Sequence, residues 1–126
     1  MKYGITSFVS PISLERKWAG LCYPLDDDIS VADGIRNLDG IEEVFMDITE
    51  GGIICMSFLH GDERYSVAIN SGILSVVSRE PYSLIELMEE VTGKINVKDI
   101  PEEIFTRLLT SAINIYQSGS KGSGYA

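Results

Sequence analysis

The stretch from Glu43 to Arg79 constrains the fold most, because apolar runs alternate there with three short turn sequences. Strands are expected over residues 43–49, 52–59, 64–70 and 73–79. The breaks between them carry glycine or asparagine, which tolerate the positive φ angles of tight hairpins. Loops this short can join only antiparallel neighbours. The stretch therefore predicts an antiparallel meander.

Two short helices are expected before this meander, following a first strand at the N-terminus. Leu14, Trp18 and Leu21 share one face of a helix predicted to begin at Pro11 and to be ended by Pro24, since apolar side chains three or four positions apart lie together. A second helix is predicted over residues 29–38, where the side chain of Asp28 or of Ser30 would accept hydrogen bonds from the first free backbone N–H groups.

Two longer amphipathic helices are predicted after the meander, over residues 83–92 and 101–117. Ser83 and Glu86 have the spacing of a capping box at the start of the first. The apolar face of the last helix is broad enough to contact the sheet and a further helix or subunit. We expect both helices on one face of a mainly antiparallel sheet of four to five strands, which is an α+β fold.

The 126 residues are expected to form one domain, residues 1–117, followed by a flexible Gly/Ser-rich tail, residues 118–126. No apolar run approaches the length of a membrane span, and the N-terminus lacks the pattern of a signal peptide. Cys22 and Cys55 lie among apolar residues and are interpreted as reduced thiols. These features together predict a cytoplasmic protein.

The charge of the chain is negative and unevenly placed. Net charge is −9, and eleven of the nineteen acidic residues lie between Asp26 and Glu63, where Arg36 is the only basic residue. Binding to nucleic acid is disfavoured because it needs clustered lysine and arginine, whereas a basic protein partner is favoured. The predicted partner-binding residues are Asp26, Asp27, Asp28, Asp33, Asp39, Glu42, Glu43, Phe45, Asp47 and Glu50.

Phe45 stands out in this acidic segment, since it lies between Glu43 and Asp47 on the same face of its predicted strand. Aromatic side chains dominate the energetics of many interfaces, while charges steer the encounter. Phe45 is therefore either an interface anchor or an ordinary core residue beneath a helix. The sequence leaves these two interpretations open.

Sequence signals for catalysis or metal binding are weak. Residues 26–28 resemble the start of a calcium loop, but Val31 and Asn37 occupy the positions that require glycine and glutamate. His60 is the only histidine, and it could pair with one of the two cysteines. Both cysteines lie in apolar runs, however, whereas a reactive thiolate needs an electropositive site. No catalytic residue, metal or cofactor is predicted.

The leading functional hypothesis is a non-catalytic, acidic binding protein that neutralises a basic protein partner. In size, charge and α+β pattern the chain resembles bacterial immunity proteins that block toxic nucleases, and phage-encoded inhibitors of defence systems. This resemblance implies a toxin or a defence protein as the partner. Small acidic export chaperones are similar too, and would imply a homodimer through the C-terminal helix. A small enzyme that uses His60 and a cysteine is the third hypothesis.

Overall fold

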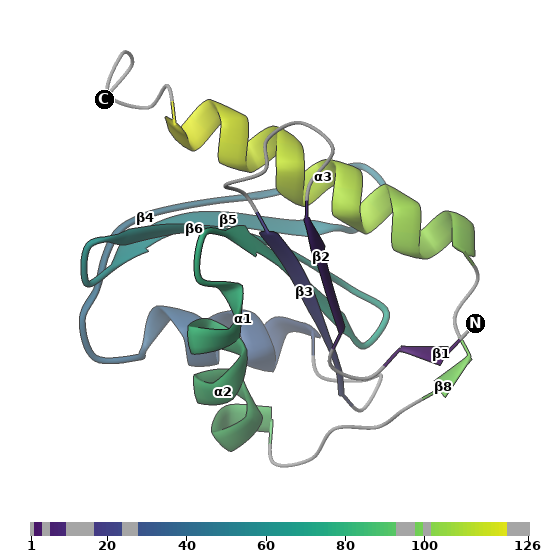
Figure 1. The fold of residues 1–126 in the computed structure, drawn as a ribbon, viewed down its shortest axis with the longest axis horizontal. Coiled ribbons are helices and arrows are strands. Elements are labelled where there is room, and N and C mark those ends of the chain that lie inside the picture. The colour runs from purple at the N-terminus through teal and green to yellow at the C-terminus, as the bar shows by residue number, and fades with distance from the viewer. Residues whose placement is uncertain are drawn as a thin grey trace.

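The computed structural model describes residues 2–3, 6–9, 17–23, 28–92, 98–99 and 102–120. Its centre is an antiparallel sheet of six strands in the order β2-β3-β7-β6-β5-β4 (Figure 1). The bounds are β2 (Thr6–Val9), β3 (Lys17–Cys22), β4 (Ile41–Ile48), β5 (Ile54–His60), β6 (Glu63–Asn70) and β7 (Ile73–Ser78). Two short strands, β1 (Lys2–Tyr3) and β8 (Lys98–Asp99), pair separately from this sheet.

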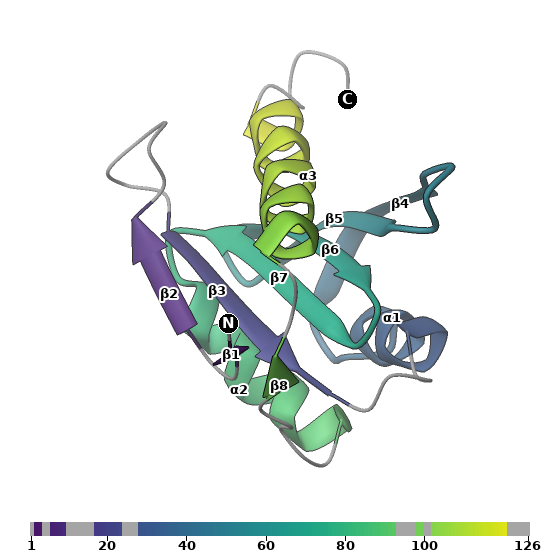
Figure 2. The ribbon, with the colours of Figure 1, turned by 90° about the vertical axis from the view of Figure 1, so that its right-hand side faces the viewer.

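Helices cover both faces of the sheet. Helices α1 (Asp28–Arg36) and α2 (Pro81–Thr92) lie on one face, and α3 (Glu102–Ser120) crosses the other (Figure 2). Helix α2 packs on β3 and β7, while α3 packs mainly on β5, β6 and β7. The predicted α+β class and the antiparallel meander from β4 to β7 are confirmed. The expectation that α2 and α3 share one face is wrong.

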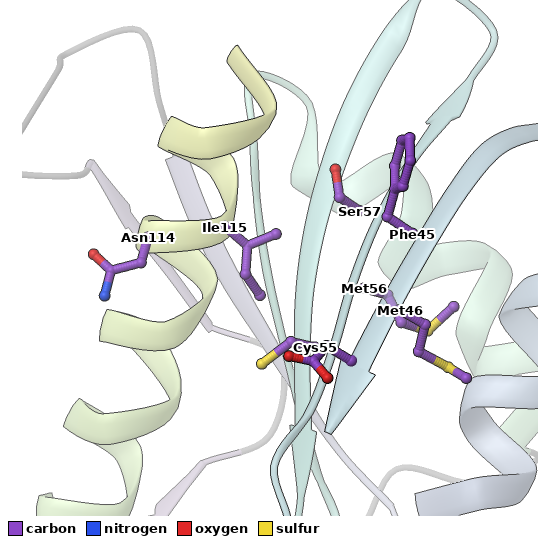
Figure 3. A pocket seen from close by; sticks show the side chains of 8 residues that line it. Phe45, Met46, Cys55, Met56, Ser57, Asn114 and Ile115 are labelled. Atoms are coloured by element: carbon purple, nitrogen blue, oxygen red, sulfur yellow. The ribbon is translucent and has the colours of Figure 1, made fainter. Parts of the chain in front are cut away.

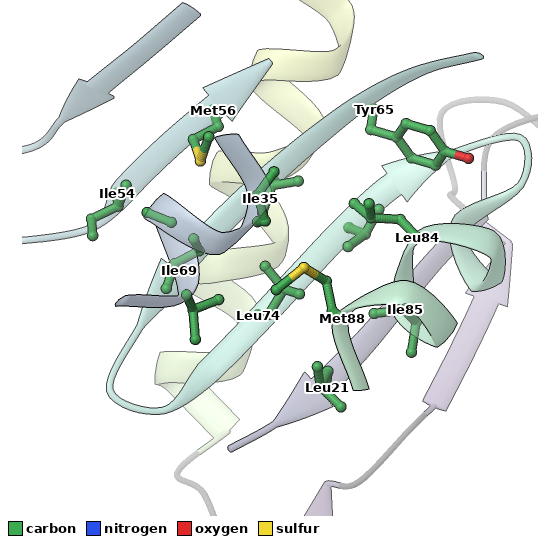
Figure 4. Close-up of a cluster of buried hydrophobic side chains, with 14 of the residues drawn as sticks. Leu21, Ile35, Ile54, Met56, Tyr65, Ile69, Leu74, Leu84, Ile85 and Met88 are labelled. Carbon is green, nitrogen blue, oxygen red and sulfur yellow. The ribbon is translucent and has the colours of Figure 1, made fainter. Parts of the chain in front are cut away.

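The alternation of side chains along β7 explains this three-layer arrangement. Leu74 and Val76 pack in the core beneath α1 and α2, whereas Ile73 and Val77 pack in the core beneath α3. Every residue of β7 is buried, so neither face can be left to water. Figure 4 shows the first of these cores, with Leu84 and its α2 neighbours over the sheet. A sheet that is apolar on both faces needs a helix on each.

The hairpin between β4 and β5 has the turn chemistry that its glycines predict. Gly52 has a φ angle of 81°, which an L-residue with a side chain rarely adopts. Its N–H donates to the Thr49 carbonyl at 2.9 Å, and the Thr49 N–H donates to the Ile53 carbonyl at 3.0 Å. This is the pattern of a three-residue loop closed by a glycine bulge.

The helix predicted between Pro11 and Pro24 is wrong where the structure can be described. Lys17–Cys22 forms β3, between β2 and β7, and residues 11–16 lie outside the described residues. Trp18 and Cys22 face the α3 core, and Leu21 faces the opposite core. A short apolar run is ambiguous between a buried helix and a central strand. Here the segment is a strand because it pairs with β7, which lies far away in the sequence.

The other helix boundaries differ from the expected ones by a few residues. Helix α2 begins at Pro81, so Ser83 lies inside its first turn and the predicted capping box is wrong. Proline suits this position because its missing N–H would be unpaired there anyway. Helix α3 extends to Ser120, so residues 118–120 of the predicted tail are helical. No helix in the described ranges has both the length and the apolar character of a membrane span.

Candidate functional site

Strand β4 is the last strand of the sheet and is exposed along most of its length. The strand order ends at β4, whose described pairing is with β5 alone. Its exposed apolar side chains include Phe45 at 49%, Met46 at 45% and Ile48 at 57% exposure. Large apolar side chains in contiguous exposed positions often mark an interaction surface. This makes β4 the first candidate for a functional site.

The two faces of β4 carry different chemistry. Asp47 lies opposite Cys55, which packs at the margin of the α3 core, so Asp47 and Phe45 point to the α3 side. Met46 and Ile48 alternate with them and point to the side of α1 and α2. The α3 side of the strand is therefore aromatic and acidic, and the other side is apolar.

A groove of about 310 Å³ lies between α3 and the hairpin of β4 and β5 (Figure 3). Phe45 stands at one side of this groove and Ile115 of α3 at the other. Because α3 packs mainly on β5 to β7, Phe45 remains half exposed and is not a core residue beneath a helix. The lining residues are Phe45, Met46, Asp47, Cys55, Met56, Ser57, Asn114 and Ile115.

A bulge interrupts β4 near its start and is fixed by an arginine. The pairing register shifts between Glu42 and Phe45, and Glu43 has a φ angle of 51°. Arg64 donates from one guanidinium nitrogen to Glu43 Oε1 at 2.9 Å and from the other to Ser57 Oγ at 3.0 Å. The guanidinium thus connects the bulge to β5 and neutralises one carboxylate of the strand.

Five of the predicted acidic residues follow one another along β4 and its flanking turns. All are exposed, and we call this set the acidic edge: Asp39, Glu42, Glu43, Asp47 and Glu50. Within the described part of the chain, Glu43 is the only member that forms a salt bridge. The remaining carboxylates form no salt bridge with a described residue, and one of them, Asp47, lies two positions from Phe45 on the same side of β4.

The other predicted acidic residues are placed elsewhere. Asp33 is exposed on α1 and forms a salt bridge of 3.5 Å with Arg36 one turn later. The Asp28 carboxylate accepts a hydrogen bond from the Tyr23 hydroxyl and two from backbone N–H groups of the turn between β6 and β7. Asp28 thus has an internal structural partner. Asp26 and Asp27 lie outside the described residues.

The hypothesis of a Cys–His pair is not supported by the geometry. Cys22 and Cys55 pack in the core beneath α3, and Cys22 is fully buried. His60 follows Cys55 by five positions on β5, so its side chain leaves the sheet on the opposite face. Its ring lies 6.4 Å from that of Tyr65, which belongs to the other core. The sheet itself therefore separates the histidine from both thiols.

The protonation of the Cys55 thiol is a second argument against Cys55 as a catalytic nucleophile. Burial raises the pKa of the Cys55 thiol above its ordinary value, and the negative charge of Asp47 raises it further. Reactive cysteines have the reverse arrangement, in which nearby positive charge stabilises the thiolate. Cys55 is thus a neutral thiol at the base of the groove. In the described ranges, no three histidine, cysteine or carboxylate side chains come together as metal ligands would.

Sequence reasoning missed the apolar half of this site. Val44, Met46 and Ile48 alternate with polar residues, which is the pattern of a strand with one buried face, yet all three side chains are exposed. Nothing in the strand itself signals this, because the same alternation fits a covered strand and an edge strand. The position of β4 at the end of the sheet depends on the order of the other strands.

The arrangement can bind through an aromatic side chain, a shallow groove and several carboxylates, and it offers no activated nucleophile among the described residues. Comparisons of the chain with protein-family models, with curated proteins and with solved structures gave no match.

Proposed function

We propose that this protein is a non-catalytic binding protein that neutralises a basic protein partner through β4. The observation that carries the proposal is that one exposed edge strand combines Phe45 with the carboxylates of the acidic edge. On this reading the protein acts as an inhibitor, in the manner of an immunity protein, and its partner is a toxin or a defence protein with a basic surface.

Each part of the surface has a separate task in this proposal. The acidic edge attracts the partner over distances up to about a Debye length, roughly 8 Å at physiological salt, and so raises the association rate. Phe45 is half exposed beside a groove, where an aromatic side chain can be enclosed when a partner docks. Phe45 therefore slows dissociation, while the carboxylates speed association.

The C-terminal helix supports this proposal better than it supports an export chaperone. Leu108 and Ala112 of α3 are fully buried against the sheet of the same chain, and Ile104, Phe105, Leu109 and Tyr116 pack beside them. The broad apolar face of this helix is thereby explained by its own sheet. A homodimer through α3 gains no support from it.

The first experiment reverses charges at two places. A triple variant with Glu42→Lys, Asp47→Lys and Glu50→Lys changes the acidic edge, and a control with Glu86→Lys, Glu102→Lys and Glu103→Lys makes the same charge change on exposed residues of α2 and α3. Association with the basic protein captured from the native host is measured by surface plasmon resonance at several salt concentrations.

We expect the edge variant to lower the association rate by at least about tenfold and to lose its salt dependence, while the control changes far less. Phe45→Ala should raise the dissociation rate by roughly tenfold or more. Equal association rates for the two triple variants would contradict the proposal.

A further inference from the structure

On the side of β4 away from β5, which no described strand pairs with, backbone groups are directed outward. Thr49 and Ile53 form a hydrogen-bonded pair, through the Thr49 N–H, at the end of the β4–β5 hairpin. Hydrogen-bonded and non-bonded pairs alternate in an antiparallel ladder. Starting from Thr49, the pair of Ile48 is therefore non-bonded, that of Asp47 is bonded and that of Met46 is non-bonded. The N–H and C=O groups of Met46 and Ile48 are thus directed away from β5. Edge groups of this kind can pair with another strand.

We propose that an extended segment of the basic partner adds to β4 as a seventh, antiparallel strand of the sheet. This inference rests on the proposed function and specifies how the partner binds. The free edge of β4 lies at the end of the sheet away from β2 and is flanked by the groove on the α3 side (Figure 2 and Figure 3). The added segment forms its main-chain bonds with Met46 and Ile48.

The side chains of β4 define what the added segment contains. Residues opposite Met46 and Ile48 share their apolar, exposed face and are expected to be apolar, such as valine. The residue between them lies opposite Asp47 on the α3 side, where the carboxylate attracts a lysine or arginine, and the residue opposite Phe45 lies on the same side. The segment is therefore an alternation of basic and apolar residues.

Charge excludes a second copy of this chain as the favoured occupant. Pairing β4 with another β4 would bring two acidic edges together in a protein whose net charge is already −9. Like charges across a strand pair are destabilising. The bulge at Glu43 also ends the regular part of the edge, which leaves residues 45–48 before the turn. The added strand is therefore short, and its binding depends on basic residues that complement the acidic edge.

The test uses a synthetic probe with the unaltered protein. The probe is an eight-residue peptide in which lysine and valine alternate, and a control has the same composition in two blocks. Two further peptides carry methyl groups on backbone amide nitrogens. In one peptide the backbone nitrogens of the valines are methylated, and in the other those of the lysines. In the proposed register the valines bond to Met46 and Ile48, and the lysine N–H groups face solvent. Binding is measured by calorimetry.

We expect methylation of the valine nitrogens to weaken binding by at least about tenfold, because the backbone bonds to β4 are lost, and methylation of the lysine nitrogens to have little effect. The block peptide should bind as weakly as the valine-methylated one. In nuclear magnetic resonance spectra, the Met46 and Ile48 amides should become protected from hydrogen exchange when the alternating peptide binds.

A variant of the protein tests the same contact from the other side. Met46→Pro removes an outward N–H, which edge strands tolerate, and Met46→Ala removes the side chain but keeps the N–H. The proline variant should bind the alternating peptide about tenfold more weakly than the alanine variant.

Several outcomes would overturn strand addition. These are equal binding of the two methylated peptides, equal binding of the block peptide, no binding of the alternating peptide, or a dimer of the free protein that Met46→Pro dissociates. None of these outcomes tests the proposed function, which is tested by measuring how the charge-reversal variants of this protein bind the captured partner. Loss of that charge effect, in contrast, would overturn the proposed function itself.

Discussion

Glu43 adopts a backbone conformation that is unfavourable for any residue with a Cβ atom. Its φ angle of 51° lies in the left-handed region, and its carboxylate is held by Arg64 at 2.9 Å. Such a conformation costs an L-residue about 1–2 kcal/mol, so the contact with Arg64 helps to maintain the bulge. The bulge in turn determines where the regular, exposed part of β4 begins.

We predict that Glu43→Gly is more stable than Glu43→Ala. Both variants lose the contact with Arg64, but only glycine adopts the positive φ angle without strain, which should be worth about 1 kcal/mol. Urea denaturation of the two variants under identical conditions measures the difference. A free energy of unfolding that is equal, or larger for alanine, would show that Glu43 is not strained.

The residues of the candidate site in 43–50 stand out in the sequence, whereas their three-dimensional surroundings do not. The carboxylates and Phe45 could be identified because a solvated strand face must alternate, and Phe45 broke the polar alternation. The exposure of Met46 and the contact of Arg64 with Glu43 could not, since both depend on which strands are neighbours. Burial on one strand is decided by elements elsewhere in the chain.

At the level of elements, a single carboxylate connects α1 to the meander. Asp28, the first residue of α1, accepts hydrogen bonds from the Ser71 N–H at 3.0 Å and the Gly72 N–H at 3.1 Å, in addition to the Tyr23 hydroxyl. These bonds link the start of the helix, the end of β3 and the β6–β7 turn. A residue interpreted as part of a binding surface thus positions three elements.

We predict that Asp28→Ala lowers the free energy of unfolding by about 2–3 kcal/mol, because two backbone N–H groups and a buried hydroxyl lose a charged acceptor. Asp33→Ala on the same helix removes only an exposed salt bridge and should cost less than about 0.5 kcal/mol. Thermal and urea denaturation of both variants provide the measurement. Equal losses would contradict a structural role for Asp28.

Element prediction succeeded where contacts are local and failed where they are distant. The strands of the meander and the helices Asp28–Arg36 and Pro81–Thr92 lie close to their predicted ranges, since turns and amphipathic patterns are encoded within them. Lys17–Cys22 was misread as a helix because its apolar residues fit both periods. Its identity comes from pairing with Ile73–Ser78, which its own residues do not encode.

On the scale of the whole molecule, the sheet separates two apolar cores. One contains Leu84 and Met88 of α2, and the other contains Leu108 and Ala112 of α3, all fully buried. The side chains of a strand leave the sheet on alternate faces, so residues of different cores touch different neighbours. The two helices therefore contribute to stability through largely independent contacts.

We predict that Leu84→Ala and Leu108→Ala each cost about 2–5 kcal/mol, and that the double variant loses the sum to within about 0.5 kcal/mol. As a control, Leu84→Ala combined with Met88→Ala in the same core should deviate from additivity. Chemical denaturation of all variants tests this. Strong coupling between Leu84 and Leu108 would mean that the cores are not independent.

The position of β3 also determines the order in which the chain can fold. Strands β4 to β7 are joined by short turns and need only local contacts, whereas β3 must close a long loop to pair with β7. Closing long loops is slow, so the meander is expected to form first and β3 to join it afterwards. Trp18, the only tryptophan of the chain, lies in β3. Its fluorescence therefore reports the step in which β3 joins the sheet.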